Sequence, residues 1–157
     1  MNVLSITAAA LLVLQPTAAK SGAQKPPAPK PAATAAKPSP TDLPVTITYK
    51  GKGAVDEAHK IIAWAFADPD ITSGSRPIGT EFASKNGGTV TFKNLSSPVY
   101  VFVVYDEKGG YDGVSGPPPH GLPCATYRKT PGTPPVALKP GAASVKFTFD
   151  DSERWSK

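Results

Sequence analysis

The sequence predicts an all-β fold, a seven-stranded antiparallel β-sandwich, and three observations support it. From Val45 onward, short segments alternate apolar and polar residues, which is typical of strands with one buried face. Glycine- and proline-containing turns separate these segments at intervals that suit a sandwich. The one candidate helical stretch, Val55–Lys60, spans little more than a turn and does not change the fold class.

Three strands are predicted in the first half of this region. Val45–Tyr49 alternates threonine with larger apolar residues, so that one face is apolar. Lys60–Ala67 has large apolar residues on one face and small ones on the other, which places Trp64 in the core and indicates a strand inside a sheet. A weaker pattern predicts a strand at Ile78–Ala83.

Four more strands are predicted after residue 85. Thr89–Leu95 has the alternating pattern of a half-buried strand, and Val99–Tyr105 is apolar on both faces, as central strands are. A weak pattern predicts a strand at Pro123–Arg128. Ser144–Phe149 alternates again and closes the domain.

The N-terminal residues 1–19 have the pattern of a secretory signal peptide. An apolar run, Val3–Leu14, is followed by Thr17-Ala18-Ala19, and small residues at these positions predict cleavage after Ala19. Ser5 and Thr7 interrupt the run, and Gln15 and Pro16 follow it, which makes it a poor membrane span. We therefore expect a periplasmic or secreted protein, with retention of the segment as an anchor as the alternative.

Residues 20–44 are rich in proline, alanine and lysine and contain no aromatic residue. Proline fixes φ and removes an amide donor, so we expect a disordered, extended linker rather than a packed element. The sandwich domain is predicted to span residues 45–157.

The net charge of +5 is concentrated in this linker, which holds four lysines and a single acidic residue, Asp42. Residues 45–157 contain 13 basic and 11 acidic residues, a net charge of +2, with no basic run interleaved with aromatics. Nucleic acid is therefore not an expected partner. We expect a monomer that binds a protein or glycan partner.

Few residues offer catalytic chemistry. Cys124 is the single cysteine, so it cannot form an internal disulfide, and no recognisable general base accompanies it in the sequence. The pattern favours a buried position in which Cys124 packs as a small apolar residue. His120, which precedes it in a proline-rich stretch, lacks the further ligands that a zinc or copper site needs. The sequence therefore predicts no catalytic residues and a protein that is not an enzyme.

Two segments carry a resemblance to a known family. Gly88–Leu95, GTVTFKNL, and Pro98–Asp106, PVYVFVVYD, resemble the signature of bacterial carboxypeptidase-regulatory-like, or transthyretin-like, sandwich domains. The resemblance implies a prealbumin-like or immunoglobulin-like sandwich that lacks catalysis and acts as an accessory, stabilising or adhesive module. The chain differs where Ser97-Pro98 replaces the usual Pro-Gly turn.

The loop that follows, from Asp106 to Asp112, resembles calcium-binding loops of related domains. Calcium requires oxygen donors at alternating positions with glycine at the sharp turn, and Asp106 and Asp112 fit two of these positions. Lys108, however, places a cation where an oxygen ligand is expected. The alternative is that the two aspartates cap turns, so no cofactor is expected, with calcium as the remaining candidate.

The functional surface is expected in the long loop Asp106–Pro119, at one end of the sandwich. Tyr111, His120 and Trp155 are the candidate ligand-binding residues. One hypothesis is a non-catalytic module that binds a partner through these loops. Another is a carbohydrate-binding module in which Tyr111 and Trp155 stack on a sugar. Alternatively, Trp155 folds back and covers the end of the sandwich.

Overall fold

The computed structural model describes residues 39–156, which form seven strands and no helix. The signal segment 1–19 and most of the predicted linker lie outside the described residues. Within residues 39–156 no helix is long and apolar enough to cross a membrane. In chain order, the strands are β1 (Leu43–Tyr49), β2 (Ile61–Phe66), β3 (Gly79–Ala83), β4 (Gly88–Phe92), β5 (Tyr100–Tyr105), β6 (Cys124–Thr126) and β7 (Val145–Phe149).

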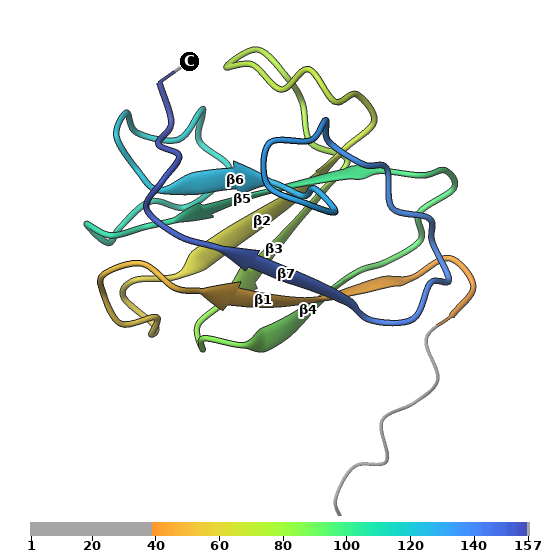
Figure 1. The fold of residues 1–157 in the computed structure, drawn as a ribbon, viewed down its shortest axis with the longest axis horizontal. Coiled ribbons are helices and arrows are strands. Elements are labelled where there is room, and N and C mark those ends of the chain that lie inside the picture. Colours follow the sequence, from red (N-terminus) through yellow and green to blue (C-terminus); the bar gives the residue numbers. More distant parts are fainter. Residues whose placement is uncertain (1–38, 157) are drawn as a thin grey trace, which may run out of the picture. The chain divides into compact units, whose positions relative to one another are not determined.

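The strands form two sheets, which confirms the predicted all-β class. One sheet has three strands in the order β4-β1-β7, and the other has four in the order β3-β2-β5-β6 (Figure 1). All seven predicted strands are present, each within a few residues of the expected range. β2 lies inside its sheet, as its small side chains on one face indicated.

One strand pair contradicts the prediction of a wholly antiparallel sandwich. β1 and β7 are parallel, with Val45 beside Val145 and Tyr49 beside Phe149, whereas the other strand pairs are antiparallel. Alternation of apolar residues shows which face of a strand is buried but not in which direction its neighbour runs. Parallel neighbours need a long connection, and here almost the whole domain lies between the two strands.

The domain also begins earlier than predicted, because β1 starts at Leu43 rather than at Val45. Leu43 is fully buried and pairs with Phe92. The carbonyl of Thr41 accepts a hydrogen bond from the amide of Leu95 at 2.9 Å. Pro44 breaks the sequence pattern here, but proline is tolerated near the start of a strand. The last residues of the predicted linker, 39–44, therefore belong to the folded domain.

A first hydrophobic core fills the space between the two sheets. Small and β-branched side chains of β2 and β5 face it from the four-stranded sheet. Larger side chains of β1, β4 and β7 face it from the other sheet. Its fully buried members include Leu43, Val45, Ile47, Ile61, Ala63, Ala65, Val99, Val101 and Val103.

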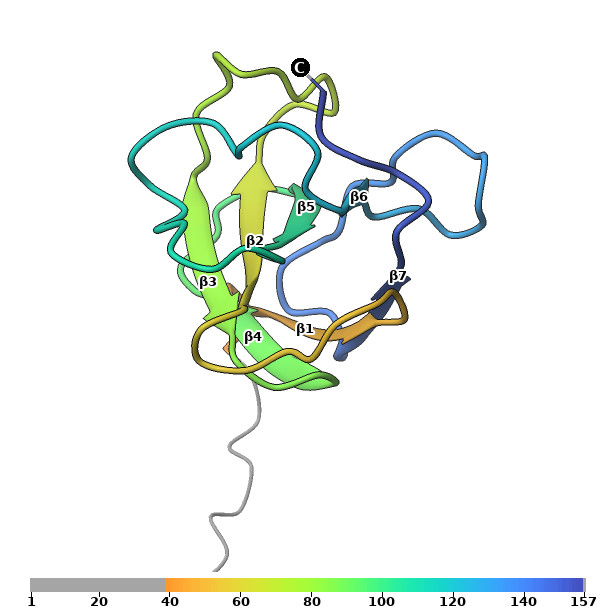
Figure 2. The same cartoon turned by 90° about the vertical axis from the view of Figure 1, so that its left-hand side faces the viewer.

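A second cluster covers the outer face of the four-stranded sheet, which in most sandwiches faces water. All six residues of β2 are buried, since Ile62, Trp64 and Phe66 point away from the first core. The predicted burial of Trp64 is confirmed, but on this outer face. The loop after β5, teal in Figure 2, crosses in front of β2 and β3, so it lies over the sheet rather than only at its end.

Candidate ligand-binding pocket

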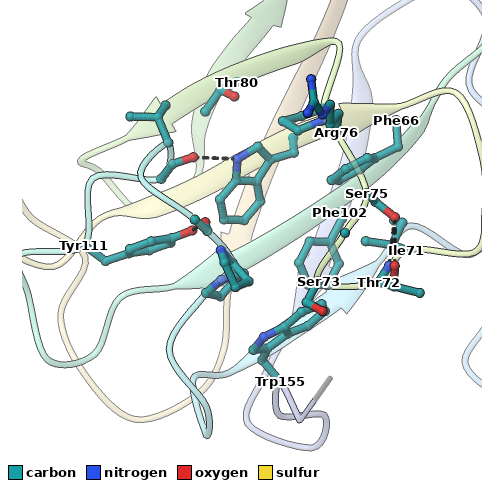
Figure 3. A pocket seen from close by; sticks show the side chains of 18 residues that line it. Phe66, Ile71, Thr72, Ser73, Ser75, Arg76, Thr80, Phe102, Tyr111 and Trp155 are labelled. Atoms are coloured by element: carbon teal, nitrogen blue, oxygen red, sulfur yellow. Dashed lines mark hydrogen bonds between the residues drawn. The ribbon is translucent and has the colours of Figure 1, made fainter.

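A pocket of about 340 Å³ lies on this outer face (Figure 3). Its floor is formed by aromatic side chains of β2 and β5, and its walls by loop residues 71–77 and 111–118. Trp155, from the C-terminal segment, closes one side. The volume falls in the range of sites for small ligands, roughly 300–1,000 Å³.

Four aromatic rings form a continuous row along this pocket. Trp64 and Phe102 are directly opposite each other in the pairing of β2 with β5, and their ring centres lie 5.8 Å apart. Tyr111 lies 6.2 Å from Trp64 at one end of the row, and Trp155 lies 5.5 Å from Phe102 at the other. Aromatic rings whose centres lie at these separations attract each other beyond the effect of burial. The register of β2 with β5 places Trp64 beside Phe102, whereas Tyr111 and Trp155 come from segments outside the strands.

Trp64 also holds the loop of residues 111–118 against the sheet. Its indole Nε1 donates a hydrogen bond to the carbonyl of Gly113 at 2.9 Å. Gly113 has a φ of 72°, and a side chain there would bring its Cβ within 2.8 Å of Ile62. Glycine is needed because the backbone turns in the left-handed region close to the sheet.

Tyr111 is held in place through both its backbone amide and its side-chain hydroxyl. Its amide donates to Oδ2 of Asp106 at 2.8 Å, and its hydroxyl donates to the carbonyl of Gly116 at 2.6 Å. Burial raises the pKa of Tyr111 to about 12, and the negative charges of Asp112 and Asp106 add to this effect. The phenol therefore stays neutral and keeps its donor role at physiological pH.

Trp155 folds back onto the four-stranded sheet, as the alternative interpretation of this residue expected, although it covers the outer face. Its amide donates to the carbonyl of Leu122 at 2.9 Å, and its own carbonyl accepts from the amide of Gly121 at 2.8 Å. The side chain is 5% exposed, yet its Nε1 has no hydrogen-bond partner among residues 39–156. Buried donors are nearly always paired in native proteins, so this N–H can serve a ligand.

The loop of residues 71–77 supplies most of the polar groups of the pocket. Ser73 and Arg76 line the pocket and are exposed at its rim (Figure 3). Arg76 takes part in none of the ion pairs formed within residues 39–156. Sequence reasoning missed this loop, because serine, threonine and glycine there gave only a turn signal.

Three large apolar residues are exposed beside this pocket. They are Ile78 (53% exposed), Phe82 (45%) and Val114 (70%), and no other large hydrophobic residue within 39–156 is as exposed. Ile78 directly precedes the edge strand β3, and Phe82 lies in it. Val114 lines the pocket itself. The ring of Phe82 lies close to Gly113, so the edge strand and the loop meet. Grouped apolar exposure of this kind marks interaction sites.

The structure brings two of the three predicted ligand-binding residues together. Tyr111 and Trp155 both line the pocket, at opposite ends of the aromatic row. His120 is exposed and does not line it. Cys124 is buried in the second cluster. The pocket therefore depends on aromatic and hydroxyl groups rather than on histidine or thiol chemistry.

Asp106 and Asp112 bind backbone amides of their own loop. Asp106 is buried and accepts from Tyr111, whereas Asp112 is exposed and accepts from the amides of Val114 and Ser115 and from the Ser115 hydroxyl. The Ser115 hydroxyl, followed by the two amides, lowers the pKa of Asp112. These contacts fit the turn-capping alternative. Within residues 39–156 no group of three or more His, Cys, Asp or Glu side chains could hold a metal ion.

Asp106→Ala should destabilise the domain by about 1–3 kcal/mol, because the partly buried amide of Tyr111 would lose its acceptor. Asp112→Ala, at an exposed turn, should cost less. Chemical denaturation of both variants measures the two decreases in the free energy of unfolding. Millimolar calcium should leave the melting temperature of the unmodified chain unchanged. A rise of several degrees that either substitution abolishes would instead establish a calcium site.

Comparisons of this chain with protein-family models, with curated proteins and with solved structures find no match. The resemblance of residues 88–106 to carboxypeptidase-regulatory-like domains therefore stays a prediction from the sequence.

Proposed function

We propose that this protein is an exported, non-catalytic binding module whose outer-face pocket takes a short segment of a protein partner. The observation that carries the proposal is the grouping of three exposed apolar residues on this side of the sheet: Val114, which lines the pocket, and Ile78 and Phe82 at the edge strand β3. Exposed apolar residues beside a buried aromatic floor suit a partner that inserts side chains into the pocket and covers the neighbouring apolar surface.

The burial of the aromatic rings favours a peptide over a sugar as the ligand. A sugar ring stacks on an open aromatic face, whereas the rings of Trp64, Phe102 and Trp155 are all at least nine-tenths buried. The pocket offers a buried indole N–H and the hydroxyls of its lining serine and threonine residues. A peptide carbonyl is a suitable acceptor for that N–H, and peptide side chains can fill the space between the loops.

Selection from a library of short random peptides displayed on phage tests this function. Peptides retained by the unmodified protein should be lost on Phe82→Glu, which places a charge on the apolar rim. Thr148→Glu is the matched control, because Thr148 is an exposed strand residue of the other sheet, in β7.

Tryptophan fluorescence against a panel of polysaccharides provides the contrasting measurement. A peptide-binding module should give no saturable response to any of them. A saturable response together with failure of the peptide selection would replace the proposal with a carbohydrate-binding module that uses Tyr111 and Trp155.

A further inference from the structure

We infer that the open edge of β3 binds the C-terminal segment of a partner protein as an added antiparallel strand, with the terminal carboxylate of that segment on Arg76. This assignment rests on the proposed function, and it names the part of the partner that binds and the way in which it binds.

The backbone of β3 has hydrogen-bonding groups that point to its open edge. In an antiparallel sheet, the amide and carbonyl of one residue point to one neighbouring strand and those of the next residue to the other. The amide of Asp106 donates to the carbonyl of Lys60 at 2.9 Å, so even-numbered residues of β2 bond to β5 and odd-numbered ones to β3. Because odd-numbered residues of β2 pair with odd-numbered residues of β3, the backbone groups of Thr80 and Phe82 point away from the sheet.

This edge is suited to a further strand, because unpaired backbone groups are a template for one. β3 contains neither lysine nor proline, two residues that commonly protect an edge. Its one charged residue, Glu81, lies on the opposite face from Phe82. An added strand would therefore place its own apolar side chains beside Phe82 and Val114, which are exposed on the outer face.

Arg76 determines the direction of the added strand. It is the only charged residue among those of residues 39–156 that line the pocket, and it forms no ion pair with any of them. Arg76 lies three residues before Gly79, where β3 begins. An antiparallel partner strand runs toward this end of β3, so its terminal carboxylate arrives beside the guanidinium. Arginine binds carboxylates through strong, charge-assisted hydrogen bonds.

The backbone between Arg76 and β3 ends the pairing at this point. Pro77 has no amide, and the amide of Ile78 donates to the carbonyl of Ala65 at 2.8 Å. Beyond Thr80, an added strand therefore meets no further backbone donor before it reaches the side chain of Arg76. Figure 3 shows Arg76 and Thr80 at the end of the pocket opposite Trp155.

The pairing also predicts the sequence pattern of the partner. The partner residues that bond to Phe82 and Thr80 are two positions apart, so both have their side chains on the outer face. The first lies beside the exposed ring of Phe82, and the second lies at the pocket, which Thr80 lines. We expect apolar residues at both positions, directly before the free carboxylate.

Two synthetic libraries of random hexapeptides test the terminal carboxylate, one with free C-terminal acids and one with C-terminal amides. Each is passed over the immobilised full chain, and retained peptides are identified by mass spectrometry. The free acids should be retained and should show the alternating apolar pattern. By fluorescence anisotropy, the amide of each retained sequence should bind at least tenfold more weakly.

Two charge substitutions test the direction of the strand. Arg76→Gln should weaken the binding of the free acids at least tenfold and leave the binding of the amides unchanged. Lys85→Gln is the matched control, because Lys85 is exposed and lies two residues beyond the opposite end of β3. It should change neither affinity. Loss of the acid preference in Lys85→Gln alone would mean a parallel strand and would overturn the inference.

Hydrogen exchange of single amides tests the strand itself. Bound peptide should slow the exchange of the amides of Thr80 and Phe82, which point to the open edge. The amides of Gly79 and Glu81 are the internal reference, because they point to β2.

The outcomes separate this inference from the proposed function. If acids and amides bind equally well, or if the amides of Thr80 and Phe82 exchange as fast with peptide as without it, the inference fails and a peptide-binding module remains. If no peptide of either library binds, the inference and the proposed function both fail.

Discussion

Replacing Trp64 with alanine is expected to lower the free energy of unfolding by about 3–5 kcal/mol, the usual cost of removing a large buried aromatic side chain. Trp64 is 3% exposed and contacts the rings of Phe102 and Tyr111. Its loss would also leave the carbonyl of Gly113 without its donor. Urea denaturation, followed by the fluorescence of Trp155, measures the change.

Trp64→Phe is the matched control, because it keeps a ring beside Phe102 and removes only the indole N–H and part of the volume. It should cost clearly less than the alanine substitution. A loss below 1 kcal/mol for Trp64→Ala would remove Trp64 from the core. It would also mean that the loop of residues 111–118 is held by other contacts.

Replacing Leu43 with alanine should destabilise the domain by about 2–5 kcal/mol, although Leu43 lies in a stretch with the composition of a linker. The side chain is fully buried in the core between the sheets and lies in the first residue of β1. Thermal and urea denaturation of the full chain measure the loss.

Thr41→Ala, two residues earlier, provides the comparison. Thr41 is exposed, and within residues 39–156 its side chain bonds only to the hydroxyl of Ser39. Its backbone carbonyl, which accepts from Leu95, remains in the variant. The change should stay within about 0.5 kcal/mol. Equal, small effects at both positions would return the domain boundary to Val45.

The layered arrangement of this domain could be predicted because the pattern of apolar residues along each strand shows which of its faces are buried. β2 and β5 are apolar on both faces, and both faces are buried, one between the sheets and one beneath the loops. The burial of Trp64 follows from the same pattern. The parallel pairing of β1 with β7 leaves no such trace, because side-chain alternation is the same for either strand direction.

The pocket could be predicted only in part. Tyr111 and Trp155 were predicted as ligand-binding residues because they are aromatic residues outside the predicted strands, and both line the pocket. The rest of the floor comes from Trp64, which the sequence pattern assigned to the core, and from Phe102, which lies on a strand predicted to be apolar on both faces. That these core rings also border a cavity depends on where the loop of residues 71–77 settles, and this is a long-range property that local patterns do not encode.

The parallel pair also determines when the domain can be completed during synthesis. Among the strands of residues 39–156, β1 leaves the ribosome first during synthesis and its neighbour β7 leaves it last. Contacts between such distant segments form late and slow the search for the native state. Until residue 149 is free, one edge of β1 lacks its partner, so a nascent chain cannot close the sandwich.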